Sequence, residues 1–504
     1  MEPTAPVRTP CRTALRIATM SIALLTGLPA LAADDGHAWR QRLEQDARRF
    51  HAAIRESHPG TVDPANPGFN AVLGKALDTT LARVQHTRDA GGYWWALREF
   101  QAFFDDGHVQ MVATRNWTPL PKRWPGFLTR FDGDRQVVAV SEDAAAPRVG
   151  AVLVSCDGLP ADMLARERLG RFSGRWMLEA QRADLGPRLF IDERNPWLAP
   201  LRECVFETRG QRHRITLQWR DMDDATFEAL RARVQPMLRA PVGLQSWPGL
   251  SWLSLGTFDG NPQSDDYGAL VSLVADVQAQ AESLREGVIV LDVRGNTGGS
   301  SHWSRRIAES LWGPAAVQRA TQKSDGVDWR VSATNIQHIR TLRDRVAAAP
   351  SPDVEQVAWL SAVLAGLEQA QQQGLALWRQ ADDETGDPEP ATPAGSGSVE
   401  RAPRVYVVTD SACASACLDA MDLWKALGVI QVGRETSADT LYMEVRAERL
   451  PSDLVWAVVP TKVYRGRLRG DNEAYRPDHV YNGDMSDTEA LQAWILERVA
   501  ATRK

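Results

Sequence analysis

Cysteine is scarce in this chain, and the common motifs that bind metal ions or nucleotide phosphates are missing. The 504 residues include five cysteines, but neither C-x-x-C nor H-E-x-x-H, the spacings that suit a zinc ion, occurs. The glycine-rich patterns G-x-x-x-x-G-K-[ST] and G-x-G-x-x-G, which hold phosphates, are absent as well. The sequence therefore predicts a protein without a metal ion or another cofactor.

Neither positive nor negative charge dominates the sequence. The formal net charge is -6, and acidic and basic residues are interspersed along the chain. A surface that binds nucleic acid needs a basic stripe or patch, and the sequence contains none. We therefore expect no nucleic-acid partner.

Long apolar runs are also lacking, apart from one near the start of the chain. Three arginines precede the run IATMSIALLTGLPALA, which ends in an A-x-A pattern at Ala32. This order of basic residues, apolar core and small residues is typical of a secretory signal peptide. The run is shorter than the roughly 20 residues that span a bilayer. We expect residues 1–32 to be removed, which would leave a secreted or periplasmic protein with no integral membrane segment.

Four cysteines remain after that removal, in a compartment where disulfides persist: Cys156, Cys204, Cys413 and Cys417. Cys156 ends one predicted strand and Cys204 starts another in the same small β-rich region, so we predict that these two pair. Two interpretations stay open for Cys413 and Cys417. They form a bridge if a helix begins near Ser415, and otherwise they are two small buried thiols, which is slightly favoured.

The apolar pattern divides the mature chain into three regions, because its length is well above that of one domain. Helical periodicity predicts an N-terminal cap over residues 33–116. Short strands separated by turn dipeptides predict a β-rich module over residues 117–222. Strands set among helices predict an α/β core over residues 223–504, with a helical insertion at 340–380 and a flexible loop at 381–402. The predicted fold class is α/β in a multidomain α+β arrangement.

Two sharp turns follow apolar strands of the third region. GVIVLDV runs into RGNTGG at residues 294–299, and VYVVTD runs into SACASACLD at residues 411–419. Ligands of open α/β sheets bind outside the carboxyl ends of the strands. A glycine-rich turn there can present backbone N–H groups to an oxyanion, beside a nucleophilic Ser or Cys in the second turn. The alternative is that these small residues only let a helix pack closely against a sheet.

The pair DVRGNTGG and SACASACLD resembles two motifs of the C-terminal processing (tail-specific) serine peptidases, D-x-R-G-N-x-G-G and S-A-S-A-S-E. The resemblance covers most of residues 246–484 apart from the insertion, and it places the family's catalytic serine on Ser415. The stretch VGAVLVSCDG resembles a turn of the PDZ domain that these peptidases usually carry. The resemblance therefore implies a PDZ-like module and a peptidase core of the ClpP/crotonase-like kind.

The sequence departs from the family where many members have a catalytic lysine. The corresponding stretch, VGRETSADTLYMEV, contains no lysine. In this respect the chain is nearer the Ser-His, tricorn-like branch, whose base is a histidine, and the D-G-H motif in FFDDGHV places that histidine on His108. The same branch has a carboxylate near the C-terminus, which falls on Glu473 or Asp471, with Glu473 preferred.

These residues would together make up a catalytic set. A histidine with a pKa near 6.5 suits a general base at neutral pH, and a carboxylate can hold its tautomer. The backbone N–H groups of Ala416 and of Gly298 or Gly299 would form the oxyanion hole. Simpler interpretations exist, since His108 can cap the end of a helix and the two acids can be solvated loop residues.

We expect a secreted or periplasmic serine endopeptidase that hydrolyses peptide bonds of extended polypeptides. The resemblance implies the polypeptide substrate, whereas the residues themselves indicate only a nucleophile, a base and an oxyanion loop. The alternative is a catalytically weak or inactive envelope protein that binds peptides by strand addition to the PDZ-like module. The sequence does not indicate an oligomeric state.

Overall fold

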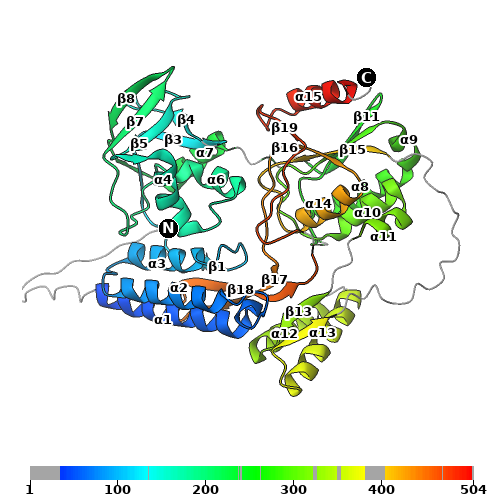
Figure 1. Ribbon diagram of the computed structural model, residues 1–504, viewed down its shortest axis with the longest axis horizontal. Coiled ribbons are helices and arrows are strands. Elements are labelled where there is room, and N and C mark those ends of the chain that lie inside the picture. Colours follow the sequence, from blue (N-terminus) through cyan, green and yellow to red (C-terminus); the bar gives the residue numbers. More distant parts are fainter. Residues whose placement is uncertain are drawn as a thin grey trace, which may run out of the picture.

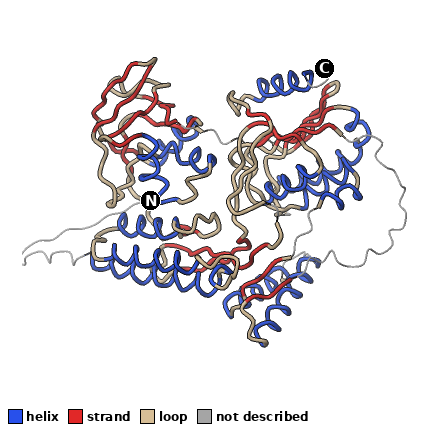
Figure 2. The backbone as a smooth tube through the Cα atoms, viewed as in Figure 1, coloured by secondary structure: helices blue, strands red, loops and turns tan. Residues whose placement is uncertain are grey.

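The structure is a computed structural model that describes residues 35–501, except 134, 236–237, 239–240, 262, 322–325, 349–353, 381–402 and 468. The predicted signal peptide and the predicted loop at 381–402 lie outside the described residues. Helices and several sheets are mixed along the chain, as Figures 1 and 2 show. This confirms the mixed helix-and-sheet class. Within the described ranges, no helix combines the length and the apolar character that a membrane crossing requires.

A six-stranded sheet forms the centre of the C-terminal region, in the order β10-β11-β12-β15-β16-β19. Its strands are Gly243–Trp247, Leu250–Ser254, Val288–Asp292, Arg404–Thr409, Ile430–Gly433 and His479–Val480. The pairs from β11 to β19 are parallel, and β10 joins as an antiparallel edge strand. Every residue of β12 is buried, as expected for a parallel strand with helices on both faces.

Helices cover both faces of this sheet (Figure 1). One face carries α8 (Asp265–Ala279), α9 (Ala281–Glu286), α10 (His302–Trp312), α11 (Pro314–Ala320) and α14 (Ala416–Ala426). The other face carries α15 (Thr488–Ala501). Side chains alternate along a strand, so Ile289 and Leu291 of β12 pack toward α8, α10 and α14, whereas Val290 packs toward α15. The carboxyl ends of β12 and β15 therefore lie side by side, and both predicted turns start there.

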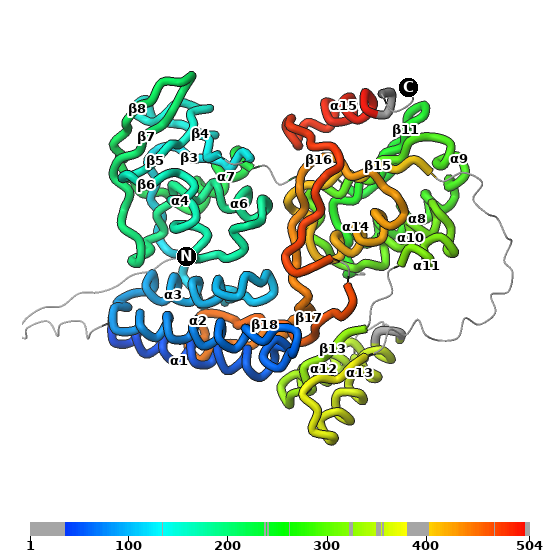
Figure 3. The backbone as a smooth tube through the Cα atoms, viewed as in Figure 1, coloured from blue at the N-terminus to red at the C-terminus, as the bar shows by residue number. Residues whose placement is uncertain are grey.

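A second sheet combines one strand from the N-terminal region with four strands from the C-terminal half of the chain. Its order is β1-β18-β13-β14, and β17 also pairs with β18. The strands are Gln110–Ala113, Val455–Tyr464, Val327–Arg330, Leu377–Gln380 and Tyr442–Arg449. The helices α1 (Asp35–Ser57), α2 (Phe69–Val84) and α3 (Ala90–Ala102) share one core with β18. Figure 3 shows the orange strands β17 and β18 beside these blue helices, so the predicted cap packs on strands from the far end of the sequence.

The predicted helical insertion is a helix pair on the end of this second sheet. The helices α12 (Ala333–Ala347) and α13 (Val354–Gln372) pack against β13 and β14, with Trp329 fully buried between them. The helical part thus begins before residue 340, and β13 and β14 belong to the same unit.

A third sheet, of six strands, lies in the middle region of the chain. Its strands β3 to β8 are Phe127–Asp132, Arg135–Ser141, Val152–Cys156, Leu159–Pro160, Glu203–Thr208 and Gln211–Thr216. Short helical segments join them: α4 (Ala161–Ala165), η2 (Arg166–Gly170), α5 (Arg171–Ser173), α6 (Glu179–Leu185) and η3 (Gly186–Arg188). We call this unit the middle module. The strands β2 (Lys122–Trp124) and β9 (Arg220–Met222) and the helix α7 (Asp224–Val234) pack on it. A single 3-10 turn, η1 (Pro59–Thr61), follows α1.

A disulfide joins two neighbouring strands of the middle module. Cys156 of β5 lies directly opposite Cys204 of β7, with a Cα–Cα distance of 4.0 Å, and the two are bridged. Because the bridge closes a loop of 48 residues, the chain-entropy model assigns it about 4 kcal/mol of stability.

Non-reducing peptide mapping should recover the peptides of Cys156 and Cys204 as one cross-linked species. The double variant Cys156→Ser/Cys204→Ser should unfold at a lower denaturant concentration than the wild type, because its unfolded chain is less constrained. Alkylation of both thiols in the native, unreduced protein would contradict this pairing.

Candidate active site

The turn after β15 holds Ser415 in an uncommon backbone conformation. Its φ is 54° and its ψ is -124°, and it immediately precedes the first residue of α14. A residue with a side chain rarely adopts a positive φ, so this conformation costs on the order of 1–3 kcal/mol. A sharp strand-to-helix turn of this kind holds a side chain out at the edge of a sheet, and Ser415 is partly exposed there.

A second disulfide encloses Ser415. Cys413 and Cys417 are bridged, with a Cα–Cα distance of 5.3 Å, and both are fully buried. This corrects the slight preference for two separate thiols. The physical reason is that α14 begins at Ala416, so Cys413 still lies in the turn and its sulfur can reach the first turn of the helix.

The glycine-rich turn after β12 lies directly against Ser415. A Cβ atom added to Gly298 would lie 2.7 Å from the Cβ of Ser415 and 2.8 Å from the carbonyl oxygen of Ala414. Gly298 also has a φ of 104°. Only glycine fits both requirements, so the close approach of the two turns depends on this residue.

The three predicted oxyanion donors are not equivalent. The N–H of Gly298 donates to Asn296 Oδ1 over 2.8 Å, so it is already used. For the N–H groups of Gly299 and Ala416, we find no acceptor among the residues that the structure describes. Unlike the N–H of Gly298, these two groups are therefore free of a protein acceptor within the described residues.

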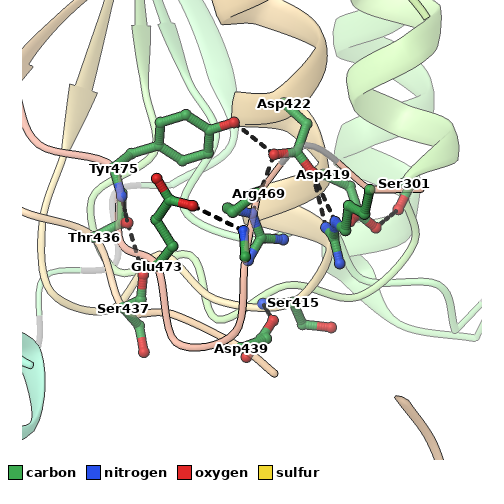
Figure 4. A network of polar contacts seen from close by, with 12 residues as sticks. Ser301, Ser415, Asp419, Asp422, Thr436, Ser437, Asp439, Arg469, Glu473 and Tyr475 are labelled. Atoms are coloured by element: carbon green, nitrogen blue, oxygen red, sulfur yellow. Dashed lines mark hydrogen bonds and ion pairs between the residues drawn. The ribbon is translucent and has the colours of Figure 1, made fainter. Parts of the chain in front are cut away.

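A buried carboxylate, Asp439, supports the backbone of the serine. The N–H of Ser415 donates to Asp439 Oδ2 over 2.9 Å, and Asp439 is only 5% exposed. Figure 4 shows Asp439 beside the backbone nitrogen of Ser415. Asp439 belongs to the stretch VGRETSADTLYMEV. This is the stretch that lacks the catalytic lysine found in many tail-specific serine peptidases, the family that the sequence resembles.

His108 lies after α3, in a loop that it shares with Asp106. The backbone N–H of His108 donates to Asp106 Oδ1 over 2.7 Å. The ring nitrogen Nδ1 of His108 lies 3.6 Å from the same oxygen. The other oxygen of Asp106 lies 3.7 Å from Nε2 of His58, which is fully buried. Asp106 thus lies between two imidazoles.

The pKa values of these groups follow from burial and from their charges. Burial opposes protonation of His108, but Asp106 and the charge of Asp439 outweigh it and raise the pKa of His108. Burial is the larger influence on His58 and lowers its pKa. The pKa of Asp106 would rise through burial alone, but the two imidazoles lower it. Asp106 is therefore ionised at neutral pH.

Asp439 connects the two halves of the candidate site. It accepts the N–H of Ser415 and its charge acts on His108. Further contacts tie the loop of His108 to the same place, because Asn472 Nδ2 donates to the Asp105 carbonyl over 2.7 Å and Arg175 donates to Asp105 and to the Ala438 carbonyl. Segments far apart in the sequence thus meet at Asp439.

The two acids predicted near the C-terminus lie in an adjacent loop. Glu473 Oε2 accepts the N–H of Gly470 over 2.8 Å (Figure 4). Asp471 accepts the N–H of Leu441 over 2.6 Å, and burial with the nearby charge of Asp106 raises the pKa of Asp471. In the part of the chain that is described, neither acid forms a hydrogen bond or an ion pair with His108.

Sequence reasoning missed Asp106, Asp439 and His58. The signal for Asp106 was present, since it is the acid of the same D-G-H motif that gave His108. Asp439 and His58 carry no such signal, because only the folded chain brings them to the site.

Comparison with solved structures finds the fold of mature CPAF. The TM-score is 0.57 at 12% identity, covering 90% of this chain and 96% of that one. Mature CPAF complexed with lactacystin matches with a TM-score of 0.56 at 12% identity, covering 88% and 94%. The photosystem II D1 C-terminal processing protease is 14% identical over 87% of this chain and 92% of that one, with a TM-score of 0.31. No family model and no curated protein matches the sequence.

Replacing Gly298 by alanine should destabilise the core region by about 1–3 kcal/mol, because the new methyl group would collide with the serine turn. The matched control is Gly268→Ala in α8, where an added Cβ meets nothing within 4 Å. That control should be neutral or slightly stabilising, since alanine favours a helix. Equal unfolding midpoints of Gly298→Ala and the wild type would show that the two turns do not lie this close.

Proposed function

We propose that this protein is a secreted or periplasmic serine endopeptidase that cleaves extended polypeptides. The observation that carries the proposal is the strained Ser415 beside two unused backbone N–H groups, with His108 held by a buried carboxylate nearby. The likeness to the CPAF fold supports it. In this proposal the middle module is the PDZ-like module, and the six-stranded sheet with its helices is the ClpP/crotonase-like core.

The reaction is the acyl transfer of a serine peptidase. Ser415 Oγ attacks the carbonyl carbon of the scissile peptide bond while its proton passes to His108 Nε2. The carbonyl oxygen becomes an oxyanion that accepts the N–H groups of Gly299 and Ala416. His108 then gives the proton to the leaving amine, and water hydrolyses the ester in a second, equivalent cycle.

The proton position on His108 decides which nitrogen is the base. An ionised Asp106 beside Nδ1 favours the tautomer with its proton on that nitrogen, which leaves Nε2 as the acceptor. We propose Asp106 as the orienting carboxylate. Glu473 and Asp471 are the alternatives, because their loop packs against the same segment.

A cavity between the middle module and the core provides room for a polypeptide. It has a volume of about 680 Å³ and is lined by Phe131, Glu179 and Gln181 of the module and by Thr297 and Ala412 of the two turns. The lining includes both basic and acidic residues, so it suits a neutral, extended chain more than a strongly charged one.

The second candidate function is peptide binding without catalysis. β8 is an edge strand of the middle module and most of its side chains are exposed, so a peptide could pair with it by strand addition. The chain also lacks the family's lysine. Labelling of the serine separates the two candidates.

A fluorophosphonate should label the wild-type protein once, at Ser415, as read by intact mass and peptide mapping. Ser415→Ala should not be labelled, and His108→Ala should be labelled far more slowly, because the hydroxyl loses its base. Ser310→Ala, which changes a partly exposed serine on α10, serves as the control and should react like the wild type. A folded wild-type protein that takes up no label would favour the binding function.

Two isosteric variants distinguish the candidate orienting acids. Asp106→Asn should lower kcat on a peptide substrate by on the order of 10³–10⁴-fold, because the amide stabilises neither the required tautomer nor the imidazolium. Glu473→Gln should lower it far less. Since Asp106 raises the pKa of His108, the remaining activity of Asp106→Asn should persist to lower pH than that of the wild type. The opposite order of the two variants would assign the role to Glu473.

A further inference from the structure

A second cavity, separate from the serine, lies between α3 and the helical segments of the middle module. Its volume is about 400 Å³. One wall is aromatic, because Trp94 and Trp117 stack with ring centroids 4.5 Å apart. Neither Ser415 nor His108 lines it. Figure 1 shows α3 directly beneath the middle module.

Two arginines that line this cavity form no direct ion pair within the described residues. Arg98 of α3 donates to the hydroxyl of Ser173 over 3.3 Å, and Arg168 donates to the Ala199 carbonyl over 2.8 Å. Within the described ranges, neither guanidinium forms an ion pair with a carboxylate. Carboxylates act on both from a distance, Glu193 and Asp184 on Arg98 and Asp192 and Asp157 on Arg168. An anion in the cavity would be the direct charged partner that both guanidinium groups lack within the described residues.

A third arginine increases the positive charge near Arg98. Burial, and then the charge of Arg188, lower the pKa of Arg98, while the charges of Glu193 and Asp184 act in the opposite direction. Arg188 itself pairs with Glu193 over 2.9 Å. Like charges this close repel one another in a region of low dielectric constant, and a bound anion removes that repulsion.

An unused hydrogen-bond donor lines the same cavity. Asn195 Oδ1 accepts the N–H of Trp197 over 3.0 Å, which fixes the amide orientation. The Nδ2 group of Asn195 is buried and has no partner within the part of the chain described. Buried donors are nearly always satisfied, so this group requires an acceptor.

We propose that this cavity binds an organic carboxylate with a flat apolar body. The carboxylate accepts from the guanidinium groups of Arg98 and Arg168, which suit its planar, two-oxygen geometry. The apolar body lies along the tryptophan wall, and Asn195 donates to a further oxygen of the ligand or to the same carboxylate. The site is independent of the proposed peptidase function, since it shares no residue with it.

Isothermal titration of the purified protein with 1-naphthoate tests the proposal. This probe combines a flat apolar body with one carboxylate, and the neutral 1-naphthalenemethanol is its matched comparison. The wild type should bind 1-naphthoate at least tenfold more tightly than the alcohol, because only the anion meets the unpaired arginines. Inorganic phosphate alone should bind more weakly than 1-naphthoate, since it makes no contact with the tryptophan wall. Equal binding of the acid and the alcohol, tighter binding of phosphate, or no binding of the acid would overturn the proposal.

Charge variants locate the binding. Arg98→Gln should weaken 1-naphthoate binding at least tenfold, while Arg130→Gln, which removes a cation from the cavity beside the serine turn, should leave it unchanged. If Arg98→Gln melts well below the wild type, Arg168→Gln replaces it and should have the same effect. Loss of binding in Arg130→Gln, or unchanged binding in the folded variants of Arg98 and Arg168, would place the ligand elsewhere and overturn the proposal.

Discussion

The buried carboxylate of Asp106 is the group on which the candidate site depends. A charge removed from water costs several kcal/mol unless hydrogen bonds and opposite charges compensate for it. Here the compensation comes from the backbone N–H of His108 and from the rings of His58 and His108. His58 Nδ1 accepts the N–H of Gly60 over 2.9 Å, so the proton of neutral His58 is on Nε2, the nitrogen that faces Asp106. His58 thus stays neutral with its protonated Nε2 facing Asp106 at 3.7 Å, and in the proposed mechanism His108 is the imidazole that exchanges protons with the substrate.

The pairing of strands in the sheets explains how the loop of Asp106 and His108 is brought close to Ser415. The loop of His108 leads into β1, which pairs with β18, so the N-terminal helices are fixed against a strand from the C-terminal half. The turn of Ser415 is fixed by the neighbouring strands β12 and β15 and by Gly298. Asp439 then accepts the N–H of Ser415, and its charge acts on His108. The site is therefore a product of long-range pairing, and no short segment contains it.

Much of the core region could be predicted from local sequence. The runs GVIVLDV and VYVVTD are buried parallel strands because they are apolar on both faces, and Gly298 marks the close approach between the turns. The run LVWAVVP shows the limit of prediction from local sequence, because an apolar strand carries no information on which sheet it joins. It became β18, in the sheet beneath the helical cap. For the same reason sequence spacing favoured Glu473, whereas the described contacts of His108 involve Asp106.

The tautomer and the pKa of His108 test this account most directly. Heteronuclear NMR of protein with ¹⁵N-labelled histidine, assigned with the variant His108→Gln, reports both. We predict that neutral His108 carries its proton on Nδ1 and titrates above the ordinary value of about 6.5, because Asp106 and Asp439 stabilise the imidazolium. A neutral ring protonated on Nε2, or a titration below that value, would contradict the account.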